Sequence, residues 1–342
     1  MALGIGSRTF VGLKTESTYG TAPSFSLSAD YTRCKSAAVR NRGAQTKGSS
    51  NLGLPWATGQ RVHQQKSAGD VSMDMFYAGM ERFFLHLMGS VATTSLTDAS
   101  VKKHIFSPSV ARQIGATLEV SADLVLMRYP GQKITRGKFG FKKNDPLEAI
   151  FSFIGLPHTS PSTPGAGIDP ATVTFREDAS GVTAVNPVES ANGFTFSVGT
   201  AGGSGYATVG IIEGDLTVDV PHAEDRGNLG SAVIAEPVPN AQPMMNISGS
   251  LKREFIDSSF ITPFINGQQK AFKWSYKSPA AIVSVDYWLV EFEAKYVRFL
   301  ETPPEVSGAG PIEDSLPFIC ESPDGTTPPL TITFQNRTAT VS

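Results

Sequence analysis

Apolar and polar residues alternate over many stretches of the chain, and alternation with a period of two is the pattern of half-buried β-strands. Branched and aromatic residues, which favour strands, are frequent in these stretches. We therefore predict a mainly β protein built from antiparallel strands. The clearest segments cover residues 116–129, 213–220, 246–255, 271–277, 286–300 and 330–336.

The sequence RGKFGFKKN at 136–144 alternates lysine with phenylalanine. It has some likeness to an RNA-recognition strand, but one lysine is inserted and two others replace the later apolar and aromatic positions of that motif. The pattern instead favours an amphipathic strand with Phe139 and Phe141 facing the core.

Two segments have the spacing of helices. YAGMERFFLHLMG at 77–89 predicts a helix that lies on a sheet and ends at Gly89, because its apolar residues form one stripe. A membrane-surface helix is the alternative, but the basic polar face that it needs is missing. REFIDSSFITPFINGQ at 253–268 predicts a second helix, shortened or kinked by Pro263 and ending near Gly267. The stripe of the first helix comprises Met80, Phe83, Phe84, Leu87 and Met88.

Segments rich in small and polar residues predict turns and loops between these elements. The Pro-, Ser- and Gly-rich stretch 156–170 is the best candidate for a domain boundary, and the polar stretch 41–53 should be a long exposed loop. GTAGGSG at 199–205 lacks the Lys-Ser/Thr pair of a phosphate-binding loop, so we interpret it as a turn.

The two halves of the chain contain the same order of elements. Each has a strand, a helix closed by glycine, a long strand that ends near arginine, and then a similar phrase, PLEAIFSFIG at 146–155 or PIEDSLPFIC at 311–320. This order predicts two tandem β domains, residues 1–160 and 161–342. A Gly-rich β segment near 175–210 is an insertion in the second domain, without a counterpart in the first.

Composition and charge narrow the classes of function. The formal net charge is −2, whereas a free nucleic-acid binder usually carries a basic excess. Cys34 and Cys320 do not form a CxxC motif, so we expect two reduced thiols in a cytosolic compartment. The first residues do not resemble a secretory signal, and without an apolar run of about 18 residues we expect no membrane span.

No constellation of catalytic residues can be assembled from the sequence. The motifs HExxH and G-x-S-x-G are absent, and the five histidines lie far apart. We assign no catalytic, cofactor-binding or metal site, and we expect a structural role for His86 in the helical stripe. The segment DLTVDVPHAED supplies oxygen ligands for a cation, although exposed carboxylates on one strand face are ordinary. The residues concerned are the histidines His63, His86, His104, His158 and His222 and the acidic group Asp215, Asp219, His222, Glu224 and Asp225.

The opening GLKTESTYGTAP at 12–23 resembles the start of siphophage tail tube proteins. Further pieces resemble that family in the same order, through 59–76, the helix ending in LMGS, KHIFSPS, TLEVSADL and YPGQKITRGKFGF. In the second half, GSLKREFID and VSGAGPIEDSLPFI are similar to the family too. The residues of the opening phrase that carry the resemblance are Gly12, Glu16, Tyr19, Gly20 and Thr21.

The resemblance implies two tandem β-sandwich or split-barrel domains, each with a flanking helix, in a structural virion protein that is not an enzyme. Copies would join their inner sheets into rings, and stacked rings would form a hollow tail tube that conducts DNA. The implied partners are further copies, the tape measure protein and DNA in the lumen, and the tail terminator and distal tail proteins. The family needs no cofactor and no membrane, and the protein would be made in the host bacterial cytoplasm.

If each half is one tube domain, three chains would build a homotrimeric ring with pseudo-sixfold symmetry. The loop around 41–60 is expected to carry ring-to-ring contacts, with Trp56 either docking on the next ring or packing on its own domain. Two other classes remain open at this point. One is a different β-rich tail component, such as a distal-tail, tail-terminator or baseplate protein, and the other is an enzyme or small-ligand barrel.

Overall fold

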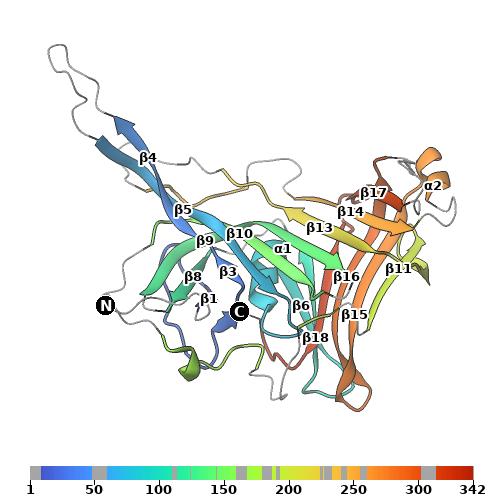
Figure 1. Cartoon of the computed structure of the whole chain (residues 1–342), viewed down its shortest axis with the longest axis horizontal. Coiled ribbons are helices and arrows are strands. Elements are labelled where there is room, and N and C mark those ends of the chain that lie inside the picture. Colours follow the sequence, from blue (N-terminus) through green and yellow to red (C-terminus); the bar gives the residue numbers. More distant parts are fainter. Residues whose placement is uncertain are drawn as a thin grey trace, which may run out of the picture.

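Antiparallel strands dominate the computed structural model of the chain (Figure 1). Three sheets can be distinguished by their pairing, and we call them the long sheet, the second sheet and the small sheet. The structure describes residues 9–47, 60–109, 114–123, 125–143, 145–158, 168–178, 187–189, 193–223, 226, 233–239, 245–254, 260–301 and 313–341.

The long sheet extends across the whole molecule and contains strands from both halves of the chain. Each neighbouring pair in it is antiparallel. A short strand, β3 (Ser36–Ala37), continues the outer side of β5 beside β4. The order across the sheet is β4 (Arg40–Lys47), β5 (Gln60–Asp74), β10 (Glu148–Gly155), β9 (Val125–Lys142), β13 (Glu213–Asp219), β14 (Asn246–Glu254) and β17 (Glu313–Cys320).

The second sheet packs against the inner face of the long sheet, and the two are connected where β16 pairs with the end of β17. Its order is β12 (Ser204–Thr208), β11 (Phe194–Thr200), β15 (Lys270–Val283), β16 (Asp286–Phe299), β18 (Thr331–Asn336), β7 (Lys102–Pro108) and β6 (Gly89–Ser95). The small sheet comprises β2 (Tyr31–Arg33), β1 (Thr9–Thr15), β8 (Ala116–Ala122) and the first part of β9. A 3₁₀ helix, η2, covers Pro170–Thr172.

The helix α1 (Glu81–Met88) lies between the sheets, as its apolar stripe predicts, and every residue of it is buried. Gly89 ends it in the left-handed region with φ 96°, which favours glycine. Phe84 is fully buried at the centre of an aromatic cluster from both halves of the chain. Its ring meets the rings of Phe106, Phe139, Phe151, Phe292 and Phe334.

The predicted second helix forms as α2 (Ile261–Ile265), a short element that contains Pro263 and is followed by Gly267. Five of the six predicted strand segments correspond to single strands, with β15 longer than expected. Phe139 and Phe141 face the core, and 201–203 form the turn expected within GTAGGSG. Most of the stretch 156–170 lies outside the described residues.

Two expectations about local structure are wrong. The segment 116–129 is not one strand, because Asp123 adopts φ 51° in a tight turn and separates β8 from β9 as a hairpin. Residues 41–47 are not loop but belong to β4, which pairs with β5. Its sequence RNRGAQTK contains no large apolar residue, so the apolar alternation that predicts strands is missing, and the strand is recognised by its backbone pairing with β5.

The order of pairing recurs in the two halves. In the first half, β10 lies between β5 and β9, and α1 follows β5 along the chain. In the second half, β17 contacts β14 on one side and the end of β16 on the other, and α2 follows β14. The last strand, β18, pairs with β7 of the first half, so the halves share a sheet. The domain boundary at residue 160 stays a prediction.

Candidate functional site: the open face and edges of the long sheet

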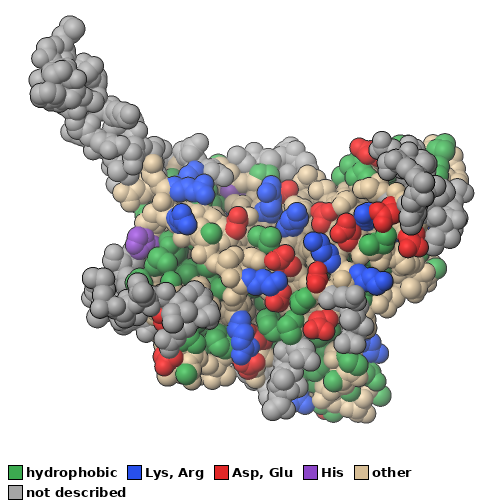
Figure 2. All heavy atoms as spheres, in the orientation of Figure 1, with side chains coloured by type: hydrophobic (Ala, Val, Ile, Leu, Met, Phe, Trp, Pro, Cys, Tyr) green, Lys and Arg blue, Asp and Glu red, His purple; other side chains and the backbone are tan. Residues whose placement is uncertain are grey.

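One face of the long sheet is covered by the core and the other is open and polar (Figure 2). Side chains alternate between the two faces along each strand. On β9, Phe139 and Phe141 point into the core, whereas Arg136, Lys138 and Lys142 are exposed on the open face. A Cβ at Gly137 on the core side would lie 2.5 Å from Leu87 of α1, so glycine lets the helix approach the sheet closely.

Acidic side chains of β13 lie directly opposite the basic side chains of β9. Glu213 is in register with Lys142, and Asp219 with Arg136, whose Nε donates to Asp219 Oδ1 at 2.5 Å. A further ion pair joins Lys252 Nζ of β14 to Glu313 Oε2 of β17 at 2.6 Å, and this contact raises the pKa of Lys252. The open face therefore alternates basic and acidic strands.

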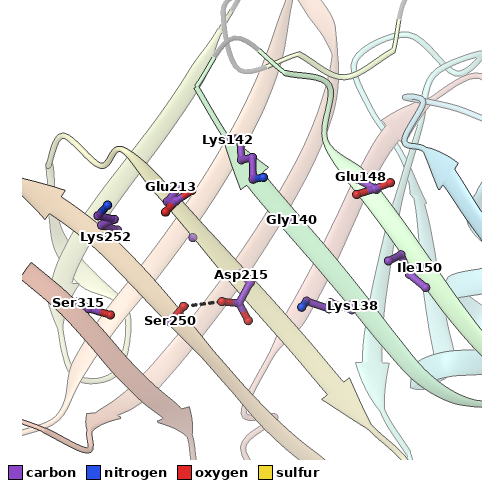
Figure 3. A pocket seen from close by; sticks show the side chains of 11 residues that line it. Lys138, Gly140, Lys142, Glu148, Ile150, Glu213, Asp215, Ser250, Lys252 and Ser315 are labelled. Atoms are coloured by element: carbon purple, nitrogen blue, oxygen red, sulfur yellow. Dashed lines mark hydrogen bonds between the residues drawn. The ribbon is translucent and has the colours of Figure 1, made fainter.

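A shallow hollow lies over β10, β9, β13, β14 and β17 on this face (Figure 3). Lys138 points between β9 and β13 towards the side of Asp215, and Ser250 Oγ donates a hydrogen bond to Asp215. Glu148 and Ile150 line the side formed by β10. Since carboxylates and lysines face the same hollow, it has no strong preference for an anion or for a cation.

Glu16 of the opening phrase holds the small sheet to the middle of β9. Its Oε1 accepts hydrogen bonds from Thr117 Oγ1 and from the Gly131 amide, both at 2.7 Å, and its Oε2 accepts from the Gly20 amide at 2.7 Å. The ring of Tyr19 lies against Gly131, where an added Cβ would come within 2.8 Å of it. The phrases GLKTESTYGTAP and YPGQKI thus meet in space, and their role is structural.

A family model described as phage tail tube protein matches residues 6–320 of the chain. The chain belongs to the phage tail tube protein family. The match covers both halves and includes every strand of the long sheet. No curated protein matches the chain significantly. The protein is therefore a structural component of a phage tail, as its opening phrase and order of elements indicate.

The described histidine side chains of this tail tube protein each have their own hydrogen-bond partners. His86 is buried, its Nε2 lies 3.1 Å from Thr15 Oγ1, and burial lowers its pKa to about 3. His104 contacts Thr93 and the Thr338 carbonyl, and His222 the Val220 carbonyl. The side chain of His63 lies outside the described residues, and His158 is hydrogen-bonded to Asn41.

The acidic segment after β13 does not gather ligands around one point. Asp219 pairs with Arg136 and Asp215 accepts from Ser250, while Glu224 and Asp225 lie outside the described residues. Within the part of the chain that the structure describes, no group of three or more His, Cys, Asp or Glu side chains is placed to hold a metal ion. Among the same residues, no helix is long and apolar enough to cross a membrane.

Both cysteines are free and partly buried, on different strands or turns of the molecule. Burial raises the pKa of Cys34 to about 12 and that of Cys320 further, so both are protonated thiols near neutral pH. Neither thiol is placed to act as a nucleophile.

Sequence reasoning did not single out the exposed charged residues near the two sides of the long sheet. Arg40 and Arg42 lie exposed on β4 at one side, and Glu254 of β14 and Glu313 of β17 lie exposed towards the other side. A single sequence offers little signal for them, because the position of a strand at the side of a sheet depends on pairing between distant segments of the chain. The repeat does offer one signal: Pro317 occurs in the second copy of a phrase whose first copy has no internal proline, and proline inside a strand favours an edge.

Proposed function

We propose that this tail tube protein assembles into closed rings whose stacked inner wall is the long sheet, and that phage DNA passes through the bore. The observation that carries the proposal is the junction of β9 with β13. There the first half of the chain and the second half join edge to edge in one unbroken ladder from Glu213↔Lys142 to Asp219↔Arg136. One chain thus contains two neighbouring wall units, connected as separate copies would be in a ring.

The stoichiometry follows from the number of wall strands. Three chains that each contribute the seven strands of the long sheet would supply about 21 strands. At a spacing of about 4.8 Å these give a circumference of about 100 Å and a diameter of about 32 Å, which strand tilt then widens. A bore of that size accommodates a DNA duplex, whereas six such chains would double it and guide DNA loosely. We therefore favour a homotrimeric ring with pseudo-sixfold symmetry.

The open face has the charge pattern that a conduit needs. Each phosphate contact made by a free lysine or arginine would add affinity and slow the passage of DNA. Arg136 and Lys252 are held by Asp219 and Glu313, and Lys35 Nζ lies 2.7 Å from Asp74 at the β5 side of the face. Paired cations are poor phosphate ligands, so DNA can slide along such a wall.

The remaining partners follow from the place of the protein in the tail. The tape measure protein occupies the lumen before DNA does, and the terminator and distal tail proteins meet the ends of the tube. Ring-to-ring contact by the loop around 41–60, with Trp56, remains part of the proposal; residues 48–59 lie outside the described residues. Subunits are made in the host cytoplasm and become part of the virion.

Electron microscopy of the concentrated protein tests the proposal directly. We expect long hollow tubes whose rings have threefold symmetry, with six similar wall units per ring. Rings with true sixfold symmetry, in which each chain contributes one wall unit, would contradict the stoichiometry. A protein that remains monomeric at high concentration, and in the presence of a tail-initiating complex, would contradict assembly itself.

A further inference from the structure

The connection between the two halves of the chain is attached to the small sheet at residues 173–178, a segment that we call the clasp. Two backbone hydrogen bonds hold the clasp to β2 and to the turn before it. The ring of Phe175 meets the ring of Phe10 of β1 edge-on, with 5.6 Å between the centroids, so the clasp covers an apolar side chain of the small sheet. The two hydrogen bonds run from the Thr174 amide to the Leu27 carbonyl at 2.9 Å and from the Arg176 amide to the Tyr31 carbonyl at 2.8 Å.

The side chain of Arg176 anchors the clasp near the start of α1. Its guanidinium donates to the Gly79 carbonyl at 3.2 Å and lies 3.4 Å from the carboxylate of Glu81, which is fully buried. A Cβ at Gly79 would come within 2.8 Å of the backbone nitrogen of Glu177, so the clasp packs closely on this turn. Residue 177 therefore lies at the tightest part of the contact.

Glu177 brings a carboxyl group into this contact, and its side chain is completely buried. Oε1 accepts hydrogen bonds from the Arg33 amide at 3.0 Å and from the Arg33 guanidinium at 3.3 Å. Oε2 is buried as well, and it has no hydrogen-bond partner among the described residues. An ionised carboxylate is costly in such a place, because one of its oxygens lacks both water and a donor.

The guanidinium of Arg33 is shared between Glu177 and Asp178. It forms a bidentate pair with Asp178, with distances of 3.1 Å from Nη1 and 2.5 Å from Nη2, both shorter than its 3.3 Å contact with Glu177. Asp178 is also partly exposed to water, whereas Glu177 is not. The positive charge of Arg33 is thus largely balanced by Asp178, and little of it is left to stabilise an ionised Glu177.

Two further titratable groups lie close to Glu177. Burial raises the pKa of Cys34 to about 12, and the negative charge of Glu177 adds to this effect, so the thiol is uncharged. Arg176 is held by Glu81 on the side of α1. Burial accordingly raises the pKa of Glu177 to about 7, against the smaller opposing effects of the hydrogen bond and the charge of Arg33. In the closed clasp the carboxyl therefore loses its proton only near neutral pH.

We propose that the clasp is closed on the small sheet while the Glu177 carboxyl is protonated and opens when that carboxyl ionises. In the open clasp the side chain reaches water, where a glutamate has its ordinary pKa of 4.5. Since the closed clasp binds the proton more tightly, its stability is complete below pH 4.5 and falls as the pH rises to about 7. The ratio of open to closed clasp should rise about tenfold per pH unit in that range and level off above it.

A second attachment keeps this opening local. Val188 is fully buried, its amide donates to the Met75 carbonyl at 2.8 Å, and its carbonyl accepts from the Leu147 amide at 2.7 Å. These are backbone hydrogen bonds at an aliphatic residue, so they do not depend on protonation. Opening of the clasp therefore leaves the connection attached at residues 187–189, and it does not require the ring assembly proposed above.

Hydrogen exchange of the full-length protein at low concentration, followed by mass spectrometry between pH 5 and pH 8, tests the proposal. After correction for the intrinsic pH dependence of exchange, peptides that cover the clasp should lose about tenfold in protection per pH unit up to about pH 7. Peptides that cover residues 187–189 should exchange more slowly at every pH. Glu177→Gln should keep the clasp protected throughout, whereas the matched control Glu189→Gln should keep the wild-type profile.

Asp178→Asn gives an independent measurement of the same cause. It leaves the guanidinium of Arg33 to Glu177 alone, so the ionised carboxylate is better tolerated and the loss of protection should be smaller and end at a lower pH. Constant protection of the clasp between pH 5 and pH 8 would overturn the proposal, and so would a wild-type profile in either Glu177→Gln or Asp178→Asn. Equal loss of protection in the clasp and at residues 187–189 would overturn it too, because the whole protein would then be unfolding. If Glu177→Gln does not fold, the wild-type and Asp178→Asn profiles decide.

Discussion

Phe84 is the residue whose loss should reveal whether the two halves of the chain share one core. Its ring is fully buried in α1 and meets aromatic rings of both halves, among them Phe139 of β9 at 5.5 Å and Phe334 of β18 at 4.9 Å between centroids. Phe84→Ala removes the whole ring from a site lined by β7, β9, β10, β16 and β18. A buried Phe→Ala change costs about 3–5 kcal/mol, a large part of the stability of a typical protein.

The assay is equilibrium unfolding in urea at low protein concentration, followed in parallel by far-ultraviolet circular dichroism and by tryptophan fluorescence. In a Trp56→Phe background the remaining tryptophans, Trp274 and Trp288, both report on the second half. If the core is shared, Phe84→Ala should shift the two signals together, by the same free energy and with an unchanged denaturant slope.

Phe194→Ala is the matched control, because that ring is only half-buried and contacts Tyr276 in a tilted arrangement. It should cost clearly less than Phe84→Ala. The reasoning is refuted if circular dichroism shows an early transition in the Phe84 variant while the tryptophan signal keeps its wild-type midpoint. That result would mean that the halves unfold independently.

Three further results are expected from single changes. Asp219→Asn removes the partner of Arg136, so the variant should bind duplex DNA more tightly in a filter assay, with a salt dependence steeper by about one phosphate contact. Gly137→Val should collide with α1 and lower the free energy of unfolding by about 1–3 kcal/mol, seen as a lower melting temperature, whereas a Cβ at Gly140 on the open side meets no atom within 4 Å and Gly140→Val should leave stability unchanged. Burial raises the pKa of Glu177 to about 7, so its protonated form favours folding; the wild type should lose stability as pH rises from about 4.5 to 7, and Glu177→Gln should remove that dependence.

The pattern of apolar and polar residues predicted the elements that are determined by short stretches of the chain. The stripe around Phe84 specified α1, and alternation placed Phe139 and Phe141 in the core, because helix and strand periodicity reflect which face is buried. Strand β4 escaped prediction because its sequence RNRGAQTK has no alternation of large apolar residues to reveal it. The turn at Asp123 escaped because a non-glycine residue with positive φ leaves no compositional signal.

The candidate site was harder to predict from the sequence, since it is formed by contacts between residues that lie far apart in the chain. Glu16 meets Gly131 across more than a hundred positions, and the junction of β9 with β13 joins residue 136 to residue 219. Repetition of a phrase indicated that two copies exist, but not that their sheets form one ladder.

The position of β18 in the second sheet has a consequence for the folding of the chain. Residues 331–336 insert between β16 and β7, so the second sheet is continuous only after this segment has been synthesised. Until then both neighbours of β18 present open ladders, and Phe84 lacks the ring of Phe334 above it. A chain that stops before residue 331 would therefore expose the strand edges of β16 and β7 that β18 otherwise covers. The shared core of the two halves is thus complete only when the segment 331–336 is in place.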